Sequence, residues 1–394
     1  MKIKVPTIDF GTSKIVTMVA QSNGERCDIV GSGAVPYSGY LQDGWNNPDE
    51  IRDVIRTAID QAQKTGNCRI HELNVGVPGM FTRVIVKEVH VSLTGPDPHV
   101  TAQDVRACFK LAEESGGDRI IHSAPAWFRV DDGKKTLSPV GIKGRELSAM
   151  IALVTADKYF IDDITYRLRD MDIEPREFYS TVAGEATYAL SQDERDKTAM
   201  LIDIGYLCTD VMVMEGDALI FHKCLDIGGG HISADIAEQL NIPFPFVEEK
   251  IKQTYSFNST NQDETYVIPA TEDEPARTVR RDEVTPIIEA KVEEIAETIN
   301  KALEEGGVKL GKWSNVYLTG GGLILNKGGK DFLAGKLHRI IREAQRTNNK
   351  MTSHVFSSAV GLTILVVTTQ EEQKAPEGGA KGLFSRAFRW LMGY

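Results

Sequence analysis

The chain has 394 residues and a mass of 43.5 kDa, which is enough for two or more domains. Hydrophobic residues make up 41% of the chain and charged residues 26%, as in an ordinary globular protein. The net charge of -11 and the pI near 5.4 exclude nucleic acid as a general partner, because binding to phosphate backbones needs a basic surface.

The cysteines and the apolar runs restrict the compartment and the class of protein. The five cysteines are odd in number and form no C-x-x-C pair, which fits neither a disulfide framework nor a zinc site and indicates a reducing cytosol. Asp9 and Lys14 interrupt the first apolar run, so no signal peptide is expected. No apolar run reaches the roughly 18–20 residues that a membrane-spanning helix needs, and residues 362–367 are better explained as a buried segment.

The first half of the chain opens with three predicted strands and a helix. An apolar strand at residues 3–9 ends in Asp9, and a glycine turn leads into strands at 14–20 and 27–35. A helix is expected over residues 49–64. An Asp at the end of a buried strand, followed by a glycine turn with free backbone N–H groups, is typical of a phosphate and metal site.

A small α+β unit is predicted to interrupt this first half. The spacing of Thr101 and Asp104 is that of a capping box, which predicts a helix from there to about Ser115. The other elements expected in this region are strands at 84–93, 120–130 and 147–155 and a helix over 157–171 that returns to the first domain.

The second half repeats the opening order of the first. A strand at 199–203 ends in Asp203, Gly205 follows in the turn, and strands at 209–214 and 218–224 come next. A triple glycine then precedes a helix predicted over residues 231–240. The repeat indicates two related α/β domains with ligands at the carboxyl ends of the strands.

The rest of the second half begins with a polar stretch without a regular pattern and continues with a predicted helix and strand. A polar stretch over residues 258–274 is expected to be a loop or a hairpin insertion. Pro286 is predicted to start a long amphipathic helix that ends at Gly306. A strand over 315–319 runs into a second triple glycine.

Three glycine-rich turns that follow strands form the predicted nucleotide site. The carboxylates of Asp9 and Asp203 suit a water-mediated Mg²⁺ ion, because Mg²⁺ keeps several waters and needs few carboxylates. The chain has no G-x-x-x-x-G-K-[ST] run, which excludes a P-loop enzyme. The candidate residues of this site are Asp9, Gly11, Thr12, Ser13, Lys14, Asp203, Gly205, Gly228, Gly229, Gly230, Gly320, Gly321 and Gly322.

The predicted inserted unit carries the most specific motifs. The stretch HSAPAWFRVD from His122 to Asp131 resembles the H-x-x-P-x-x-Y-x-x-D segment of FtsA. The stretch SPVGIKGREL from Ser138 to Leu147 resembles the N-P-V-G-x-x-G-x-x-L run that follows it. Together with the two Asp-x-Gly turns, these motifs make essentially the whole chain resemble the FtsA family of bacterial cell-division proteins, within the actin-like ATPase superfamily.

This resemblance implies an α/β, actin-like fold of two related domains around a nucleotide cleft, with an FtsA-type α+β subdomain inserted in the first. The implied boundaries are 1–83 and 157–195 for domain I, 84–156 for the inserted subdomain, 196–229 and 306–369 for the core of domain II with its late hinge helix, 230–305 for its upper lobe, 370–382 for a flexible linker and 383–394 for an amphipathic membrane-targeting helix.

The resemblance also implies ligands and partners. It implies ATP and Mg²⁺ as ligands, adds Asp210 to the second turn, and places Glu249 and Lys252 in the lobe over the adenosine. The implied function is to tether FtsZ filaments to the cytoplasmic face of the cell membrane at the division septum, with filaments of the protein itself. FtsZ is expected to bind through its C-terminal peptide to the lobe 230–305, and other divisome proteins are expected partners.

Two departures from the family pattern bear on ATP hydrolysis. Many relatives have D-x-G-G-G-T-x-D in the second turn, whereas this chain has DIGYLCTD, in which Tyr206 and Leu207 crowd a loop that needs bare backbone. In the first hinge helix, Ala183 stands where actin-like hydrolases often have an acid, and Glu185 is a candidate substitute. We therefore expect ATP to be bound and to be turned over slowly or not at all.

The C-terminal tail has the pattern of a membrane-surface helix. It follows a linker, 370–382, that carries nothing to build a core. On a helical wheel its apolar residues cover one arc with arginines beside it, as in helices that lie on anionic membranes. One such helix binds weakly, and a filament that displays many copies binds through avidity. The residues expected at the membrane are Leu383, Phe384, Arg386, Phe388, Arg389, Trp390 and Leu391.

Two other functions remain open from the sequence. An actin-like ATP-binding protein of pilus assembly, of the PilM type, shares the two turns but leaves the inserted-unit motifs and the tail unexplained. A sugar or acetate kinase on the same fold needs a substrate-binding base in the cleft, and it also leaves the tail unexplained.

Overall fold

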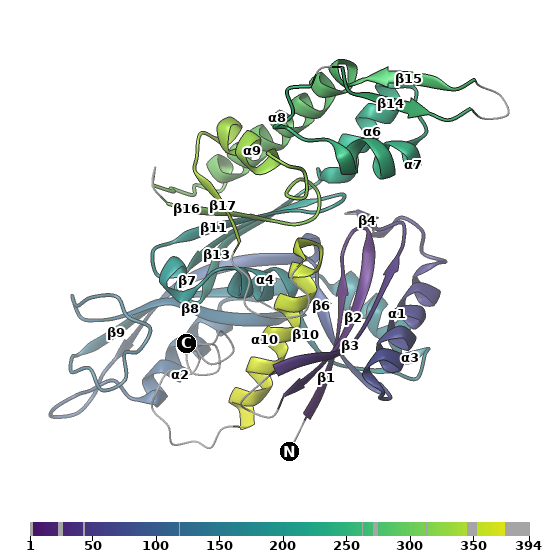
Figure 1. Cartoon of the computed structure of the whole chain (residues 1–394). Coiled ribbons are helices and arrows are strands. Elements are labelled where there is room, and N and C mark those ends of the chain that lie inside the picture. The colour runs from purple at the N-terminus through teal and green to yellow at the C-terminus, as the bar shows by residue number, and fades with distance from the viewer. Residues whose placement is uncertain are drawn as a thin grey trace. The chain divides into compact units, whose positions relative to one another are not determined.

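The structure is a computed structural model of the whole chain (Figure 1). It describes residues 3–22, 27–41, 44–117, 119–261, 263–270, 275–311, 314–344 and 353–374. The predicted membrane helix, 383–394, lies outside the described residues, as does the predicted linker from residue 375 onward. Within the described ranges, no helix is both long enough and apolar enough to cross a membrane.

The chain divides into two compact units, each assembled from separate stretches of sequence. Unit 1 comprises Met1–Leu201, Met212–His222 and Gln345–Tyr394, and unit 2 comprises Ile202–Val211 and Lys223–Ala344.

Unit 1 contains a five-stranded sheet of order β10-β6-β1-β2-β3, in which β1 pairs antiparallel with β2 and parallel with β6. Its strands are β1 (Ile3–Phe10), β2 (Lys14–Ser22), β3 (Cys27–Pro36), β6 (Glu72–Val77) and β10 (Glu174–Ser180). The helices that pack on it are α1 (Ile51–Gly66), α3 (Lys158–Arg169), α4 (Thr181–Ala189) and α10 (Ser357–Lys374).

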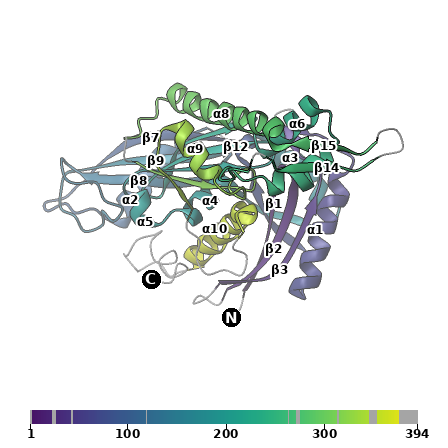
Figure 2. The same cartoon turned by 45° about the horizontal axis from the view of Figure 1, so that its top comes forward.

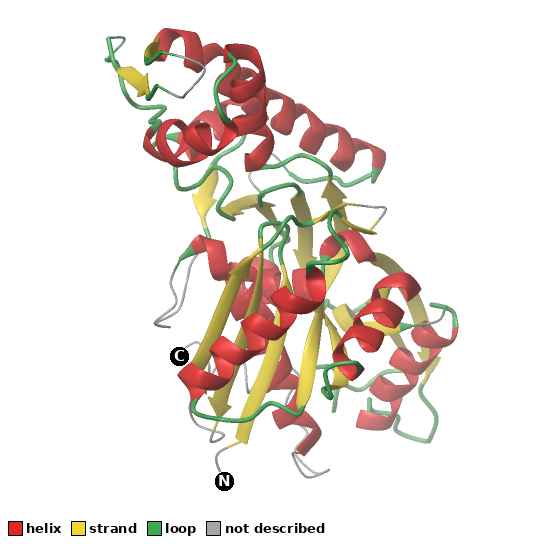
Figure 3. Cartoon of the chain, turned by 90° about the vertical axis from the view of Figure 1, so that its right-hand side faces the viewer, coloured by secondary structure: helices red, strands yellow, loops and turns green. Residues whose placement is uncertain are grey.

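Alternate residues of β1 face two different layers of helices. Ile8 and Phe10 belong to a buried cluster with residues of α1 and α3, and α1 runs along that face of the sheet (Figure 3). Thr7 faces the other way, where its hydroxyl lies 2.7 Å from the hydroxyl of Thr363 in α10. Because side chains alternate along a strand, Asp9 lies on the same face as Thr7. The strand thus carries the predicted carboxylate to the α10 side of the sheet.

The helices α4 and α10 cross in direct backbone contact. A Cβ atom on Gly184 would lie 2.9 Å from the carbonyl oxygen of Gly361, and one on Gly361 would lie 2.5 Å from Cα of Glu185. Glycine is therefore required at the crossing, since any side chain would push the helices apart. The predicted buried segment 362–367 lies in α10 and is largely buried there.

The inserted subdomain is a three-stranded antiparallel sheet of order β7-β9-β8 with α2 packed on it. The predicted capping box is confirmed, because the Thr101 N–H donates to Asp104 Oδ2 (2.8 Å) and the Asp104 N–H donates to Thr101 Oγ1 (3.3 Å). The elements are β7 (Thr82–Ser92), α2 (Ala102–Glu114), β8 (Ile120–Val130) and β9 (Glu146–Ala156).

A second five-stranded sheet has the order β13-β12-β11-β16-β17. It repeats the opening of the first sheet, because β11 and β12 are consecutive strands joined by the Asp-x-Gly turn. The strands are β11 (Ala199–Ile204), β12 (Thr209–Glu215), β13 (Ala218–Leu225), β16 (Asn315–Thr319) and β17 (Ile341–Glu343).

The helices of unit 2 pack on one another, with α8 beside α6 and α9 (Figure 2). The helices of this unit are α6 (Gly229–Leu240), α7 (Phe244–Phe246), the π-helix η2 (Val247–Lys252), α8 (Arg281–Glu305) and α9 (Gly329–Leu337). The hairpin is formed by β14 (Thr265–Ile268) and β15 (Arg277–Arg280). The remaining short elements, all in unit 1, are β4 (Tyr40–Leu41), β5 (Gly44–Trp45), η1 (Gly79–Phe81), α5 (Gln192–Arg195) and η3 (His354–Phe356).

Two predicted boundaries are wrong. The helix expected to start at Pro286 begins at Arg281, because the Arg280 N–H donates to the Glu283 carboxylate (2.8 Å) and caps the helix earlier. Pro286 lies inside α8. The linker expected from residue 370 begins too early, because α10 continues to Lys374 and the side chain of Gln370 is buried.

Candidate functional site

The first Asp-x-Gly turn joins β1 to β2 in unit 1. Asp9 is 3% exposed and is held by two hydroxyl groups, since Ser358 Oγ donates to Oδ2 at 2.7 Å and Thr181 Oγ1 donates to Oδ1 at 3.3 Å. Both donors stand in the first turns of helices, Thr181 in α4 and Ser358 in α10. Helix N-termini favour negative charge, so the position suits a carboxylate.

Burial nevertheless has the largest effect on the pKa of Asp9. It raises the pKa of the carboxyl group, against the opposing effects of Ser358, Thr181 and the charge of Lys14. A cation near this turn would lower that pKa, because an opposite charge favours the ionised form. The carboxylate is thus placed where a bound cation would be favourable.

The ammonium group of Lys14 also contacts an aromatic ring outside the turn. Its Nζ lies 5.3 Å from the ring centroid of Phe356, the last residue before α10. Tyr37 Oη donates to the carbonyl oxygen of Gly11 at 2.7 Å. These contacts hold the turn from the β3 side and from the α10 side.

The second Asp-x-Gly turn, in unit 2, is interlocked with both triple glycines through backbone hydrogen bonds. Gly229 N–H donates to the carbonyl of Gly205 (2.9 Å), and Gly230 N–H donates to that of Tyr206 (2.7 Å). Gly322 N–H donates to the carbonyl of Ile204 (2.7 Å). The second Asp-x-Gly turn and the two triple glycines therefore form one cluster within unit 2, and the first Asp-x-Gly turn lies in unit 1.

Bare backbone is required throughout this cluster. A Cβ on Gly229 would lie 2.4 Å from Cα of Gly322. A Cβ on Gly320, whose φ is 86°, would lie 2.0 Å from Oδ1 of Asp203. Side chains at these positions would displace the carboxylate and separate the turns.

The expectation of free N–H groups in these turns is wrong for several glycines. Gly11 N–H donates to the carbonyl of Lys14 (3.1 Å), and Gly205 N–H donates to that of Cys208 (2.9 Å). The N–H groups of Gly229, Gly230 and Gly322 are used inside the cluster, as described above. Tight hairpin turns close with such bonds, so these donors stabilise the turns and are not available to phosphate.

Lys252 is buried beside the second turn. Its Nζ lies 5.8 Å from the ring centroid of Tyr206 and 3.4 Å from Oε1 of Glu248. Burial lowers its pKa, and Glu248 acts against that effect. Glu249, which was predicted to share this site, is exposed, and its neighbour Glu248 takes the position. The reason is that residues 247–252 form a π-helix, which changes the face that each residue presents.

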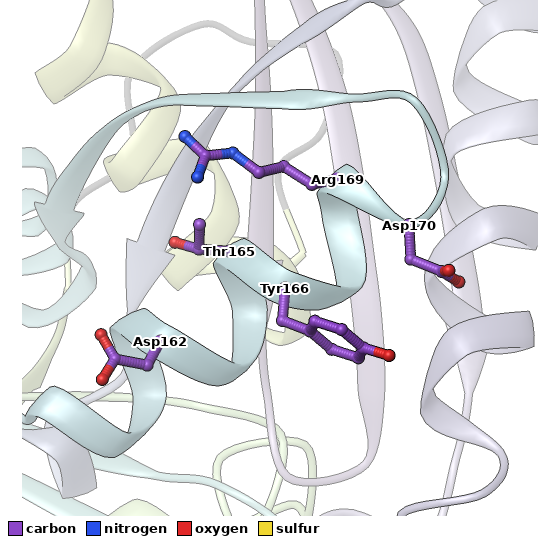
Figure 4. Close-up of a pocket in the computed structure, with 5 residues that line it drawn as sticks. All are labelled: Asp162, Thr165, Tyr166, Arg169 and Asp170. Carbon is purple, nitrogen blue, oxygen red and sulfur yellow. The ribbon is translucent and has the colours of Figure 1, made fainter.

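A surface hollow of about 440 Å³ lies along α3 (Figure 4). Arg169 is paired with Glu174 and Asp170 with Arg52, so its charges are already compensated by neighbours. We assign it no function. Its lining residues are Asp162, Thr165, Tyr166, Arg169 and Asp170.

Two family models match the chain. Residues 79–155 match the SHS2 domain inserted in FtsA, and residues 200–361 match the cell division protein FtsA. The first match covers the sheet β7-β9-β8, and the second covers the interlocked glycine turns. The chain belongs to the FtsA family.

The most similar relatives agree with this assignment. The FtsA of Pseudomonas aeruginosa is 24% identical over 98% of this chain and 97% of its own length. The FtsA of Escherichia coli K12 is 24% identical over 80% of this chain and 77% of its own length. This FtsA-family chain is therefore related to division proteins along nearly its full length.

Solved structures show that the FtsA-family chain has an actin-like fold. The PilM–PilN type IV pilus biogenesis complex aligns with a TM-score of 0.61 at 17% identity, over 93% of this chain and 99% of that one. MreB5 of Spiroplasma citri bound to ADP aligns with a TM-score of 0.56 at 11% identity, over 95% of this chain and 99% of that one. At these identities the likeness concerns the fold alone.

Residues that the sequence did not single out lie beside the candidate residues of each unit. Thr181 and Ser358 hold Asp9 in unit 1, and Glu248 lies beside Lys252 in unit 2. Asn326 Nδ2 donates to the carbonyl of Lys252 (2.6 Å) and fixes the end of the π-helix. For Thr181 and Ser358, the only indication in the sequence was a residue with a hydroxyl group at the start of each helix.

The chemistry of the residues at the two turns is suited to a nucleotide bound with Mg²⁺. Each turn follows a strand whose penultimate residue is an aspartate, and the glycines of the cluster in unit 2 pack closely against neighbouring backbone. The carboxylates of Asp9, in unit 1, and of Asp203, in unit 2, each suit a Mg²⁺ ion held through water, and Lys252, in unit 2, suits a negatively charged group. A bound nucleotide would supply a phosphoanhydride bond, and these residues would bind and orient it.

Proposed function

We propose that the protein binds ATP with Mg²⁺, forms filaments, and tethers FtsZ filaments to the cytoplasmic face of the cell membrane at the division septum. The observation that supports this most is the inserted sheet β7-β9-β8, whose residues match a subdomain named for FtsA. The pilus-assembly alternative has in its favour only a likeness in fold.

The nucleotide part of the proposal rests on the two turns. Asp9 and Asp203 are the proposed ligands of Mg²⁺ through water, and the glycine segments at 228–230 and 320–322 are proposed to lie against the nucleotide. Thr12 and Ser13 are further proposed contacts. Because several glycine N–H groups are committed to the turns, side-chain donors such as Ser13 and Lys252 take a larger share of phosphate binding.

The proposed turnover of ATP is slow or absent. Tyr206 stands where many relatives have a glycine, and its ring lies close to Gly230, since a Cβ on Gly230 would be 3.0 Å from a ring carbon. Lys252 lies over the same ring. This side chain fills space that a bare loop would leave to the terminal phosphates, which favours binding without rapid hydrolysis.

The tether has two proposed ends. The membrane end is the tail, 383–394, through Leu383, Phe384, Phe388, Trp390 and the arginines beside them. The FtsZ end is the lobe 230–305, which carries α6, the π-helix, the hairpin and α8, and which accepts the C-terminal peptide of FtsZ. Other divisome proteins join the same assembly.

The proposal is tested by electron microscopy on lipid monolayers containing anionic lipid, with ATP and Mg²⁺. The full chain is compared with a chain that ends at Gly379 and with the full chain carrying Asp9→Asn. We expect filaments on lipid only for the full chain, since Asp9→Asn weakens nucleotide binding and the shortened chain lacks the anchor. Dispersed protein off the lipid in all three samples would overturn the proposal.

A further inference from the structure

Two cysteines and an aspartate from neighbouring strands meet directly beyond the second turn. Among the described residues, the ligand atoms of Cys208, Asp210 and Cys224 all lie within 4.8 Å of one another. All three residues belong to unit 2. Their spacing along the chain gave no sign of a metal site, because one ligand comes from a different strand.

Strand geometry explains why these three side chains converge. Cys208 directly precedes β12 and Asp210 is its second residue, so the two side chains leave the same face, two residues apart. Thr209 between them points the other way, and its hydroxyl donates to the carbonyl of Ile227 at 2.7 Å. Cys224 comes from β13, the neighbour of β12 in the sheet.

We infer that Cys208, Asp210 and Cys224 form a binding site for one Zn²⁺ ion. Zinc takes thiolate and carboxylate ligands in tetrahedral geometry, with Zn–S near 2.3 Å and Zn–O near 2.0–2.2 Å, so ligand atoms about 3.3–3.8 Å apart are required. Atoms already within 4.8 Å reach that geometry by small side-chain rotations. Three protein ligands leave the fourth position to water.

The donor set selects zinc over other ions and over a simple disulfide. Thiolates are poor ligands for Mg²⁺ and good ones for zinc. Because thiolate and carboxylate ligands bind in their deprotonated form, zinc binding at this site releases protons. A disulfide would use the two sulfurs and give Asp210 no role.

The site has a structural consequence for the second turn. The carbonyl of Cys208 accepts the hydrogen bond that closes the turn at Gly205 (2.9 Å), and a Cβ on Gly228 would lie 2.9 Å from the Cys208 nitrogen. A metal ion on Cys208 therefore braces the end of the turn that packs on the glycine cluster. This inference does not depend on the tether or on filaments.

Metal analysis of the full-length protein tests the site. Reduced protein is loaded with Zn²⁺, passed over a desalting column and analysed for bound metal, and Co²⁺ loading reports thiolate ligation by its charge-transfer absorption. We expect about one ion per chain in the wild type and in Cys68→Ser, a partly buried cysteine of unit 1 that serves as the control. Cys208→Ser and Cys224→Ser should lose at least about a hundredfold in affinity.

A second measurement needs only the wild-type fold. Zn²⁺ should slow alkylation of Cys208 and Cys224 and leave that of Cys68 unchanged, and Mg²⁺ should protect none of them. Zinc uptake equal in wild type and in the two serine variants, or no protection in the wild type, would overturn the site. In that case a mass loss of two hydrogens after mild oxidation would assign the pair to disulfide chemistry.

Discussion

The hydroxyl of Ser358 donates a 2.7 Å hydrogen bond to the carboxylate of Asp9, across 349 positions of sequence. Asp9 is the penultimate residue of the first strand of the chain, and Ser358 lies in the first turn of the last helix that the structure describes. The bond ties α10 to the first turn. Any movement of α10 relative to the sheet would therefore change the surroundings of the carboxylate.

Replacing Ser358 with alanine is expected to weaken binding of Mg-ATP. The loss of a donor raises the pKa of Asp9 further, because the effect of burial remains, and the carboxylate loses its fixed orientation. A hydrogen bond to a charged group contributes about 1.5–3 kcal/mol, so affinity should fall by roughly tenfold or more. The affinity is measured by titration with a fluorescent ATP analogue, and Ser357→Ala, at a buried neighbour, is the control. An equal loss of affinity in both variants would count against the role of the hydrogen bond.

Asp9→Asn should stabilise the empty protein and abolish its response to Mg-ATP. The pKa of Asp9 is raised in the folded state, so the stability linked to its protonated form is present at low pH and is lost as pH rises through the folded pKa. At neutral pH the asparagine removes that cost and should raise the melting temperature by about 2–4 °C. Thermal melts with and without Mg-ATP test both parts. A ligand-induced shift equal to that of the wild type would show that Asp9 takes no part in binding.

Tyr206→Gly should increase ATP turnover. The substitution removes the ring that packs beside Gly230 and under Lys252, and so reopens the bare loop of the second turn. We expect wild-type turnover below about 1 s⁻¹, at the low end for enzymes, and about a tenfold increase in the glycine variant. Phosphate release measures it, and Tyr206→Phe, which keeps the ring, should behave as wild type. Fast turnover in the wild type would contradict the explanation.

The stability of unit 1 should fall between pH 6.5 and pH 4 because of His122. Burial lowers the pKa of this histidine from 6.5 to about 4, so in that interval the unfolded chain binds a proton that the folded chain does not. Stability therefore decreases as pH falls, by at most about 3 kcal/mol. Urea unfolding at several pH values should show a flatter profile for His122→Gln, and the exposed His99→Gln should keep the wild-type slope. An unchanged profile in His122→Gln would assign the slope to other groups.

The sequence predicted elements that depend on local pattern, and it missed contacts that depend on distant packing. The strand ending in Asp9, the capping box at Thr101 and the strand over 315–319 follow from periodicity and short-range chemistry. The position of Glu248 instead of Glu249 depends on a π-helix, which no simple periodicity indicates.

Polar contacts between residues far apart in the sequence could not be predicted, because the fold decides which groups meet. Arg195 is 1% exposed, and its guanidinium donates to the carbonyl of Gly216 and to the carboxylate of Asp217. Nothing in the local sequence distinguishes it from a surface arginine, since burial of a charge is decided by what the fold brings to it. Ser358 and Cys224 were missed for the same reason.

Recruitment of FtsZ to vesicles tests the central claim most directly. FtsZ filaments and anionic vesicles are mixed with the full chain or with the chain that ends at Gly379, with ATP and Mg²⁺, and the vesicles are floated. We predict FtsZ in the vesicle fraction with the full chain and its loss with the shortened one. Equal FtsZ in the vesicle fraction with both chains, or none with either, would contradict the account.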